Sequence, residues 1–268
     1  MSAVEAGGTM PSAATLAREV LGAMRTASQI APFSRRVPDF GLPEGYAVAA
    51  ELHAIWQKQP VGRKIGFTNR TIWERYGVSA PMWGVMTTDT VTPIGDGPFA
   101  VAPFCQPRLE PEVALKLARP PEAGMDEAEL ADCIEWFAPA FEIVHSIFPD
   151  WSFALSDCAA ANGLHGQLLL GPPLETGAFA LELPAISLEL RRNSALVETG
   201  AGENVLGGPL SALRHLVETL SRDGGKPLAT GELITTGTLT DAWPISPGDT
   251  FHATYKGSPL STIRASFI

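Results

Sequence analysis

The spacing of apolar residues divides this chain into a helical beginning and a strand-rich remainder. Over residues 12–27 the apolar positions recur at helical spacing, which predicts an amphipathic helix. Prolines interrupt the chain after it, and a second helix is predicted over residues 43–57. We therefore expect a helical N-terminal region at residues 1–60, in which residues 1–12 are small, polar and disordered.

Beyond residue 60 most apolar residues lie in short runs bounded by glycine and proline, a pattern typical of strands. Residues 185–200 are predicted to form a hairpin that turns at residues 192–194. Two helices interrupt the strands. One is predicted over residues 125–138, and the other lies within residues 204–224, where leucines from Leu210 to Leu220 recur at helical spacing and Gly224 and Gly225 end the helix. We therefore expect residues 61–268 to form an α+β domain.

Composition and charge narrow the class of protein. The hydrophobic content of 45% indicates a sizeable core, and the low charged content of 18% suggests surface buried between identical subunits. A formal net charge of -10 argues against a nucleic-acid partner, because phosphates need basic side chains. The three cysteines have no Cys-x-x-Cys pair, and no apolar run or N-terminal leader indicates membrane insertion or export. We therefore expect a soluble, cytoplasmic protein.

Three acidic residues lie in apolar surroundings. Glu110 and Glu112 precede an apolar run with the pattern of a strand, and alternate residues of a strand point to one face. Glu142 is enclosed by apolar residues some thirty positions later. Three carboxylates in one pocket repel each other unless a cation joins them, and Mg²⁺ or Mn²⁺ prefers such oxygen ligands. The alternative is that Glu110 and Glu112 lie on a solvent-facing side of the strand while Glu142 ends a helix.

Several other polar residues are candidates for binding or proton transfer. Lys64 lies between two glycines and could project its ammonium into a pocket, although most lysines are solvated. Thr236 and Thr238 flank a glycine and could offer hydroxyl and N–H groups to a carboxylate. Asn162 and His165 lie in an apolar, small-residue segment, where each needs a partner or a ligand; a lone histidine there is more often structural.

Six short motifs together resemble the 2-keto-4-pentenoate hydratase and 4-oxalocrotonate decarboxylase group of the fumarylacetoacetate hydrolase superfamily. They are Lys-Ile-Gly-Phe-Thr at 64–68, Glu-Pro-Glu at 110–112, Pro-Ala-Phe-Glu-Ile-Val at 139–144, Gly-Gly-Pro-Leu at 207–210, Ile-Thr-Thr-Gly-Thr at 234–238 and Pro-Gly-Asp at 247–249. The resemblance extends from about residue 16 to the C-terminus. No dinucleotide, Walker or serine-hydrolase motif competes with it.

The resemblance implies a mixed β-roll core with an N-terminal helical region and an oligomer of identical subunits. It also implies a Mg²⁺ or Mn²⁺ ion on Glu110, Glu112 and Glu142, with Lys64 as a nearby base or carboxylate-binding group. The expected activity is that of a metal-dependent lyase, a hydratase or decarboxylase of a short 2-keto acid or its dienol in aromatic-compound degradation. Lys64 would move the proton, and Thr236 and Thr238 would hold the substrate carboxylate.

The chain departs from the family pattern at two motifs. Where the hydratases usually carry Pro-Asp-Phe-Gly, residues 81–84 read Pro-Met-Trp-Gly, and where they carry Ala-Asp-Asn-Ala-Ser, residues 160–164 read Ala-Ala-Asn-Gly-Leu. If the apolar Met82, Trp83 and Leu164 line the pocket, they favour a less polar or bulkier substrate end, and Asn162 beside them is a further candidate for substrate binding. His165 could take over the proton transfer of the missing serine.

Two other functions are compatible with the sequence. One is C–C hydrolysis of an acylpyruvate, although Glu51 and His53 lie two apart on a predicted helix and do not match the His-Glu pair of that branch. The other is a non-catalytic subunit that stabilises a pathway enzyme in a complex, which the missing acid and serine suggest.

Overall fold

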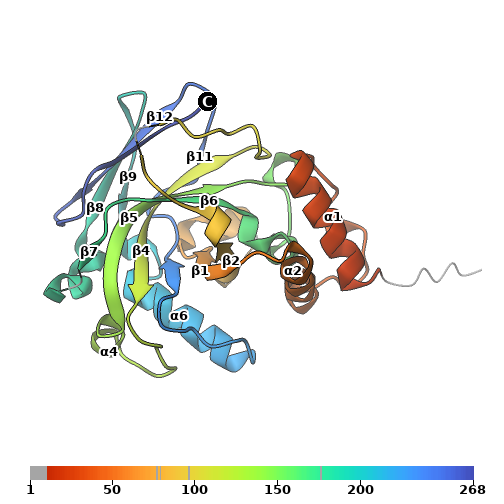
Figure 1. Cartoon of the computed structure of the whole chain (residues 1–268), viewed down its shortest axis with the longest axis horizontal. Coiled ribbons are helices and arrows are strands. Elements are labelled where there is room, and N and C mark those ends of the chain that lie inside the picture. Colours follow the sequence, from red (N-terminus) through yellow and green to blue (C-terminus); the bar gives the residue numbers. More distant parts are fainter. Residues whose placement is uncertain (1–10, 77, 79, 96, 176) are drawn as a thin grey trace, which may run out of the picture.

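The computed structural model describes residues 11–76, 78, 80–95, 97–175 and 177–268. The predicted disorder of the first residues falls mostly outside these ranges. Two sheets make the core: one has the strand order β2-β1-β10-β4-β5-β6-β3 with β11 beside β4 and β7 beside β5, and the other has the order β13-β12-β8-β9. Parallel and antiparallel pairs occur together in the larger sheet, since β1 pairs with β10 in parallel and with β2 antiparallel. This curled mixed sheet with helices is the predicted α+β fold (Figure 1).

The strands and helices have the following bounds. The strands of the larger sheet are β1 Pro60–Gly66, β2 Met82–Thr87, β3 Val91–Pro93, β4 Arg108–Leu117, β5 Ile134–Val144, β6 His165–Leu170, β7 Leu174–Glu175, β10 Leu233–Thr235 and β11 Trp243–Pro244. The smaller sheet contains β8 Ser187–Arg192, β9 Ala195–Ala201, β12 Thr250–Lys256 and β13 Ile263–Ser266. The α-helices are α1 Ala13–Thr26, α2 Leu42–Trp56, α3 Trp73–Tyr76, α4 Glu127–Ala131, α5 Leu155–Ala160 and α6 Pro209–Arg222.

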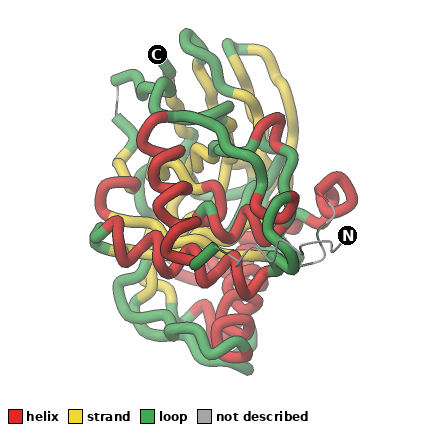
Figure 2. Tube along the Cα trace, turned by 90° about the vertical axis from the view of Figure 1, so that its right-hand side faces the viewer, coloured by secondary structure: helices red, strands yellow, loops and turns green. Residues whose placement is uncertain are grey.

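Helices α1 and α2 lie together at one side of the molecule (Figures 1 and 2). They share a hydrophobic cluster with the segment around α5, as the buried Leu16, Leu52 and Phe148 show. Asp157 of α5 stabilises the contact between the N-terminal region and this segment. Its carboxylate accepts hydrogen bonds from the Ser34 N–H and hydroxyl as well as from the Ala154 N–H. The N-terminal helices thereby support the segment that leads into β6.

Several predicted elements are confirmed. Helices α1 and α2 begin and end within a residue or two of the predicted bounds, and β8 and β9 form the predicted hairpin. Helix α6 also lies where the leucine spacing places it. No helix of the described residues is both long and apolar enough to cross a bilayer.

The helix predicted over residues 125–138 is wrong in its second half. Asp126 does cap a helix, since its side chain accepts the Glu129 N–H, but α4 ends at Ala131 and β5 begins at Ile134. Residues 137–144 of β5 are buried on both faces of the strand. A strand buried on both faces is apolar at nearly every position, so its pattern does not differ from that of a buried helix.

Candidate active site

The pairing of β4 with β5 brings the three glutamates together. Glu110 lies directly opposite Glu142 in this antiparallel pair, and Glu112 follows on the same face of β4. A carboxylate oxygen from each of the three lies within 4.8 Å of the others. Glu112 and Glu142 are fully buried, and Glu142 is inside a strand. The alternative of a solvent-facing pair and a helix end is therefore wrong.

The surroundings shift the pKa values of the three carboxylates in different directions. Burial raises the pKa of Glu110 to about 7. Burial and the charges of Glu142 and Glu110 raise the pKa of Glu112 well above its ordinary value. Burial also disfavours charge on Glu142, but Lys64 and His165 outweigh it and hold its pKa at about 2. Lys64 and His165 thus outweigh burial at Glu142, whereas burial outweighs the charge of Lys64 at Glu110 and Glu112.

The donor set fits a divalent cation. Glu112 Oε1 is buried and has no hydrogen-bond partner among the described residues, and the buried Glu142 Oε2 accepts no hydrogen bond from them either, although Lys64 Nζ lies 3.1 Å away. The second oxygen of Glu112 accepts the Gly237 N–H at 2.8 Å, which fixes the carboxylate. Leaving buried acceptors without a partner costs free energy. A hard cation with oxygen ligands satisfies both oxygens and neutralises the excess negative charge.

Lys64 lies on β1 and is 3% exposed, so the interpretation as a solvated lysine is wrong. Its Nζ lies 3.1 Å from Glu142 Oε2. Burial lowers the pKa of Lys64, but Glu142, Glu110 and Glu112 together outweigh burial and raise it. The ammonium therefore keeps its proton at neutral pH.

His165 lies behind Glu142. Its Nδ1 is 2.7 Å from Glu142 Oε1, and its Nε2 is 2.9 Å from Thr90 Oγ1. The Thr90 hydroxyl donates to the Thr87 carbonyl, so it accepts from His165 Nε2. His165 is buried and is not among the described residues that line the cavity beside the glutamates. This position favours orientation of Glu142 over the predicted proton transfer.

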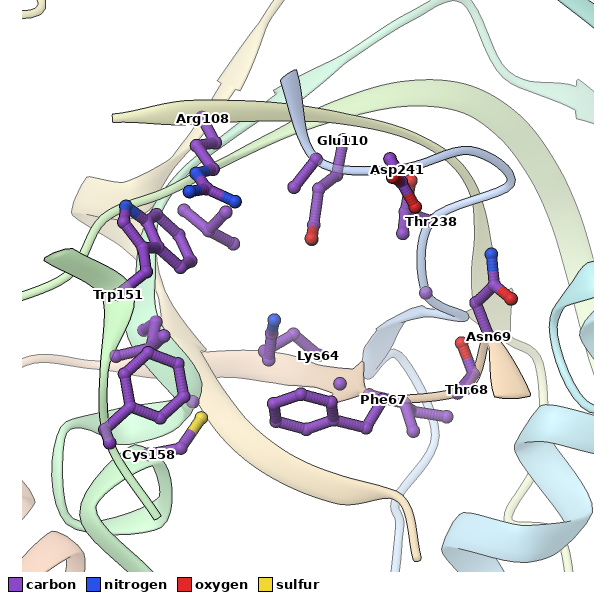
Figure 3. Close-up of a pocket in the computed structure, with 18 residues that line it drawn as sticks. Lys64, Phe67, Thr68, Asn69, Arg108, Glu110, Trp151, Cys158, Thr238 and Asp241 are labelled. Atoms are coloured by element: carbon purple, nitrogen blue, oxygen red, sulfur yellow. The ribbon is translucent and has the colours of Figure 1, made fainter. Parts of the chain in front are cut away.

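A cavity lies beside the carboxylates (Figure 3). Figure 3 shows Glu110 and Lys64 on opposite walls, with Arg108 and Trp151 at one end and Asn69, Thr238 and Asp241 at the other. Apolar side chains complete the lining, including Phe67, Val144, Phe153 and Leu164. The cavity thus offers charged groups along a largely apolar passage.

The predicted substrate-binding residues separate into two groups. Leu164 and Thr238 line the cavity. Met82, Asn162 and Thr236 are not among the described residues of its lining. These three side chains are 2% exposed or less.

Each of the three side chains that are not part of the described cavity lining contacts other residues of the fold. Met82 belongs to a hydrophobic cluster, and the hydroxyl of Thr236 donates to the Val113 carbonyl at 2.9 Å. The Asn162 amide bonds the N–H and carbonyl of Val85 at 2.7 and 2.9 Å, and its oxygen lies 3.0 Å from His53 Nε2. These contacts explain why a buried asparagine and threonine are tolerated without a ligand.

Most of the cavity lining was not predicted, and Thr68, Arg108 and Trp151 show why. Thr68 is 1% exposed, and its Oγ1 has no hydrogen-bond partner among the described residues. Arg108 lies two residues before Glu110, so the alternation that pairs Glu110 with Glu112 could have identified it. The sequence gives no comparable signal for Trp151, because contacts with residues distant in the sequence determine its position.

Comparisons with known proteins agree with this geometry. The model of the fumarylacetoacetate (FAA) hydrolase C-terminal family matches residues 63–266. The chain is 32% identical to a 2-keto-4-pentenoate hydratase of Paraburkholderia xenovorans, over 94% of this chain and 93% of that protein. It is 28% identical to a 2-hydroxyhexa-2,4-dienoate hydratase of Comamonas testosteroni, over 93% and 96% of the two chains. The structure of a 4-oxalocrotonate decarboxylase from Pseudomonas putida G7, complexed with magnesium and adipate, superposes with a TM-score of 0.87 at 25% identity over 96% and 97% of the chains.

Proposed function

Because the chain belongs to the fumarylacetoacetate hydrolase C-terminal family, we propose that it is a divalent-metal-dependent lyase, a hydratase or decarboxylase of a short 2-keto acid or its dienol. The observation that carries the proposal is the buried cluster of Glu110, Glu112 and Glu142 beside a cavity that Lys64 also lines. The hydratase and decarboxylase relatives support the same reaction class, and solved decarboxylase structures hold magnesium or calcium.

Glu110, Glu112 and Glu142 would hold the ion, and Mg²⁺ or Mn²⁺ suits their hard oxygen ligands. When bound, the ion supplies a Lewis acid that polarises a 2-oxo group. His165 fixes the orientation of Glu142 through the 2.7 Å contact. Glu112 is fixed by the Gly237 N–H. These contacts prepare the carboxylates before the ion arrives.

The proposed mechanism assigns proton transfer to Lys64. The three glutamates keep it as an ammonium, so it acts as a general acid. Its Nζ also offers a positive charge near the place where the substrate oxygen becomes negative. Hydration and decarboxylation both develop negative charge there, so this geometry serves either reaction.

Thr68 and Thr238 would bind the substrate carboxylate. Both line the cavity, and the Thr68 hydroxyl has no partner among the described residues. A buried hydroxyl that lacks a partner gains a full hydrogen bond when a carboxylate arrives. Apolar Leu164 and Phe153 exclude water from the rest of the passage.

The test is turnover of two substrates by purified protein with Mg²⁺. Freshly generated 2-hydroxypenta-2,4-dienoate and 4-oxalocrotonate are followed by ultraviolet absorbance, and the products are identified by NMR. A 4-hydroxy-2-keto acid identifies hydration, and CO₂ released from 4-oxalocrotonate identifies decarboxylation. Glu112→Gln should abolish the metal-dependent rate, while the exposed Glu203→Gln should not change it. Full activity of the Glu112 variant would refute the mechanism.

The alternatives have less support. The acylpyruvate hydrolase hypothesis needs a residue pair near the substrate, but His53 bonds Asn162 and does not appear in the described lining. A non-catalytic subunit predicts weak metal binding and no turnover in the same assay. Assembly into a homo-oligomer, with or without a pathway enzyme, stays a prediction that sedimentation of the purified protein can test.

A further inference from the structure

Three consecutive residues before β6 have a left-handed backbone. The φ angles of Asn162, Gly163 and Leu164 are 54°, 66° and 58°, a conformation that residues other than glycine disfavour. Such a backbone persists only where surrounding contacts hold it, and it often occurs at functional sites. Gly163 and Leu164 both line the cavity. The turn at Asn162–Leu164 is therefore part of the wall of the site.

The Asn162 side chain holds this turn to β2. Its Oδ1 accepts the Val85 N–H at 2.7 Å, and its Nδ2 donates to the Val85 carbonyl at 2.9 Å. His53 Nε2 lies 3.0 Å from Oδ1 and donates to it, because an amide oxygen can only accept. Asn162 is 1% exposed, so water competes little for these bonds. Helix α2 is thus connected to the turn through His53.

The turn packs directly against the stem of Lys64. A Cβ added at Gly163 would lie 2.9 Å from Lys64 Cδ, closer than two carbon atoms approach unless one of them shifts. Gly84 of β2 pairs with Lys64 of β1, and a Cβ added at Gly84 would lie 2.3 Å from the Asn162 carbonyl oxygen. Glycine at both positions allows this close approach. The turn therefore limits where the lysine stem can lie.

The same turn leads into the start of β6. The His165 N–H donates to the Asn162 carbonyl, and His165 Nδ1 lies 2.7 Å from Glu142 Oε1. Lys64 Nζ lies 3.1 Å from the other oxygen of that carboxylate. The turn thus contacts one of the two groups that approach Glu142 and is bonded to the other. A displaced turn would change the place of the Lys64 ammonium relative to the carboxylate.

We propose that Asn162, supported by His53, is a positioning residue that sets the place of the Lys64 ammonium in the site. Asn162 acts through the turn, since it is not among the described residues that line the cavity. The inference rests on the proposed function, because Lys64 is the proton donor of that proposal. It also gives the N-terminal helical region a part in the reaction, because His53 belongs to α2.

A set of variants separates positioning from stability. Asn162→Ala removes all three side-chain bonds, His53→Leu removes one of them, and His53→Gln keeps a donor at that position. Asn193→Ala is the matched control. Asn193 also has a left-handed φ, 49°, and its side chain also bonds Asp249 and the Thr250 N–H, but it is not among the described residues of the cavity lining. Unfolding curves give the stability of each variant.

Two measurements report on Lys64. Protein labelled with ¹³C at the lysine Cε gives an NMR signal for Lys64, which Lys64→Met identifies among the five lysines of the chain. This signal does not depend on turnover. The second measurement is kcat and KM for 2-hydroxypenta-2,4-dienoate or 4-oxalocrotonate, whichever the wild type converts, together with the affinity for Mg²⁺.

Asn162→Ala should shift the Lys64 signal and lower kcat by about tenfold or more, as expected when a catalytic group is displaced. KM and Mg²⁺ affinity should change by less than about twofold, because the carboxylates and the threonine hydroxyls stay in place. His53→Leu should have a smaller effect in the same direction, and His53→Gln should restore wild-type behaviour. Asn193→Ala should lower stability without changing kcat or the Lys64 signal.

An unchanged Lys64 signal in Asn162→Ala overturns the proposal, and if that variant does not fold, an unchanged signal in His53→Leu does so. An equal loss of kcat in Asn193→Ala also overturns it, because general destabilisation would then explain the effect. The NMR signal keeps this test separate from the proposed function. A shifted signal in a protein that turns over neither substrate would support the positioning role and count against the lyase proposal, whereas turnover with an unchanged signal would overturn the positioning role alone.

Discussion

Glu110→Gln should stabilise the ion-free protein at alkaline pH while it weakens divalent-cation binding. The substitution raises stability but lowers cation affinity because Glu110 has a different role in the site with an ion and in the site without one. With an ion present, Glu110 would be one of its ligands under the proposed function, and glutamine would be a poorer one. Without an ion, the Glu110 carboxylate shares the cluster with Glu112 and Glu142, within 4.8 Å, and glutamine removes one charge from it.

The size of the effect follows from the pKa of Glu110. Burial, followed by the charge of Glu142, raises this pKa from 4.5 to about 7, against the opposing charges of Lys64 and Arg108. A difference of this size corresponds to about 3 kcal/mol of folding free energy. Because the folded state binds the proton more tightly than the unfolded state, the stability from protonated Glu110 is complete below pH 4.5 and is lost as pH rises through about 7. Glutamine does not ionise, so the variant avoids this loss.

The assay is urea unfolding in EDTA at about pH 5 and pH 8.5, repeated with saturating Mg²⁺. The variant should gain up to about 3 kcal/mol relative to wild type between the two pH values in EDTA. Saturating Mg²⁺ should stabilise wild type more than the variant, since binding to the folded state adds stability. Glu203→Gln, at an exposed position, is the control. A variant that loses stability relative to wild type as pH rises in EDTA would refute the electrostatic reasoning.

Two further predictions concern the support of the site. Thr68→Val should lower kcat/KM for a 2-oxo acid by about tenfold with unchanged stability, whereas Thr236→Val should lower the free energy of unfolding by about 1 kcal/mol, because of these two hydroxyls only that of Thr236 has a hydrogen-bond partner among the described residues. A loss of stability for Thr68→Val would contradict this. His165→Ala should weaken Mg²⁺ binding about ten- to a hundredfold by releasing Glu142, and calorimetry that finds unchanged affinity would remove its positioning role.

The carboxylate cluster could be predicted because its signals are local. Alternation along a strand places Glu110 and Glu112 on one face, and an acid among apolar residues, as at Glu142, rarely lies inside a protein without compensation. The register that sets Glu110 opposite Glu142 was not readable from the sequence. It depends on how β4 and β5 pair, and the second strand was partly taken for a helix.

The buried polar residues whose partners belong to the chain itself show the limit of such reasoning. Asn162 and His165 were expected to need a partner or a ligand, and Thr236 was expected to offer its hydroxyl to a carboxylate. Their partners lie far along the chain, as with the Thr236 hydroxyl and the Val113 carbonyl. A sequence shows that a buried polar group must be satisfied, but only the fold shows whether the chain or a ligand satisfies it.

The methionine at position 82 limits the groups with which Lys64 could exchange a proton. Met82 is 2% exposed, and its Sδ lies 4.0 Å from the thiol of Cys158, which lines the cavity. The usual acid at this position would give the lysine a second site for its proton, whereas the thioether accepts none. In the proposed mechanism Lys64 would therefore exchange its proton with the substrate or with the glutamates, whose charges raise its pKa. An ammonium of this kind can protonate a dienol carbon but cannot activate water. Hydration by this chain would therefore require a second group that activates water, whereas delivery of a proton to the dienol would not.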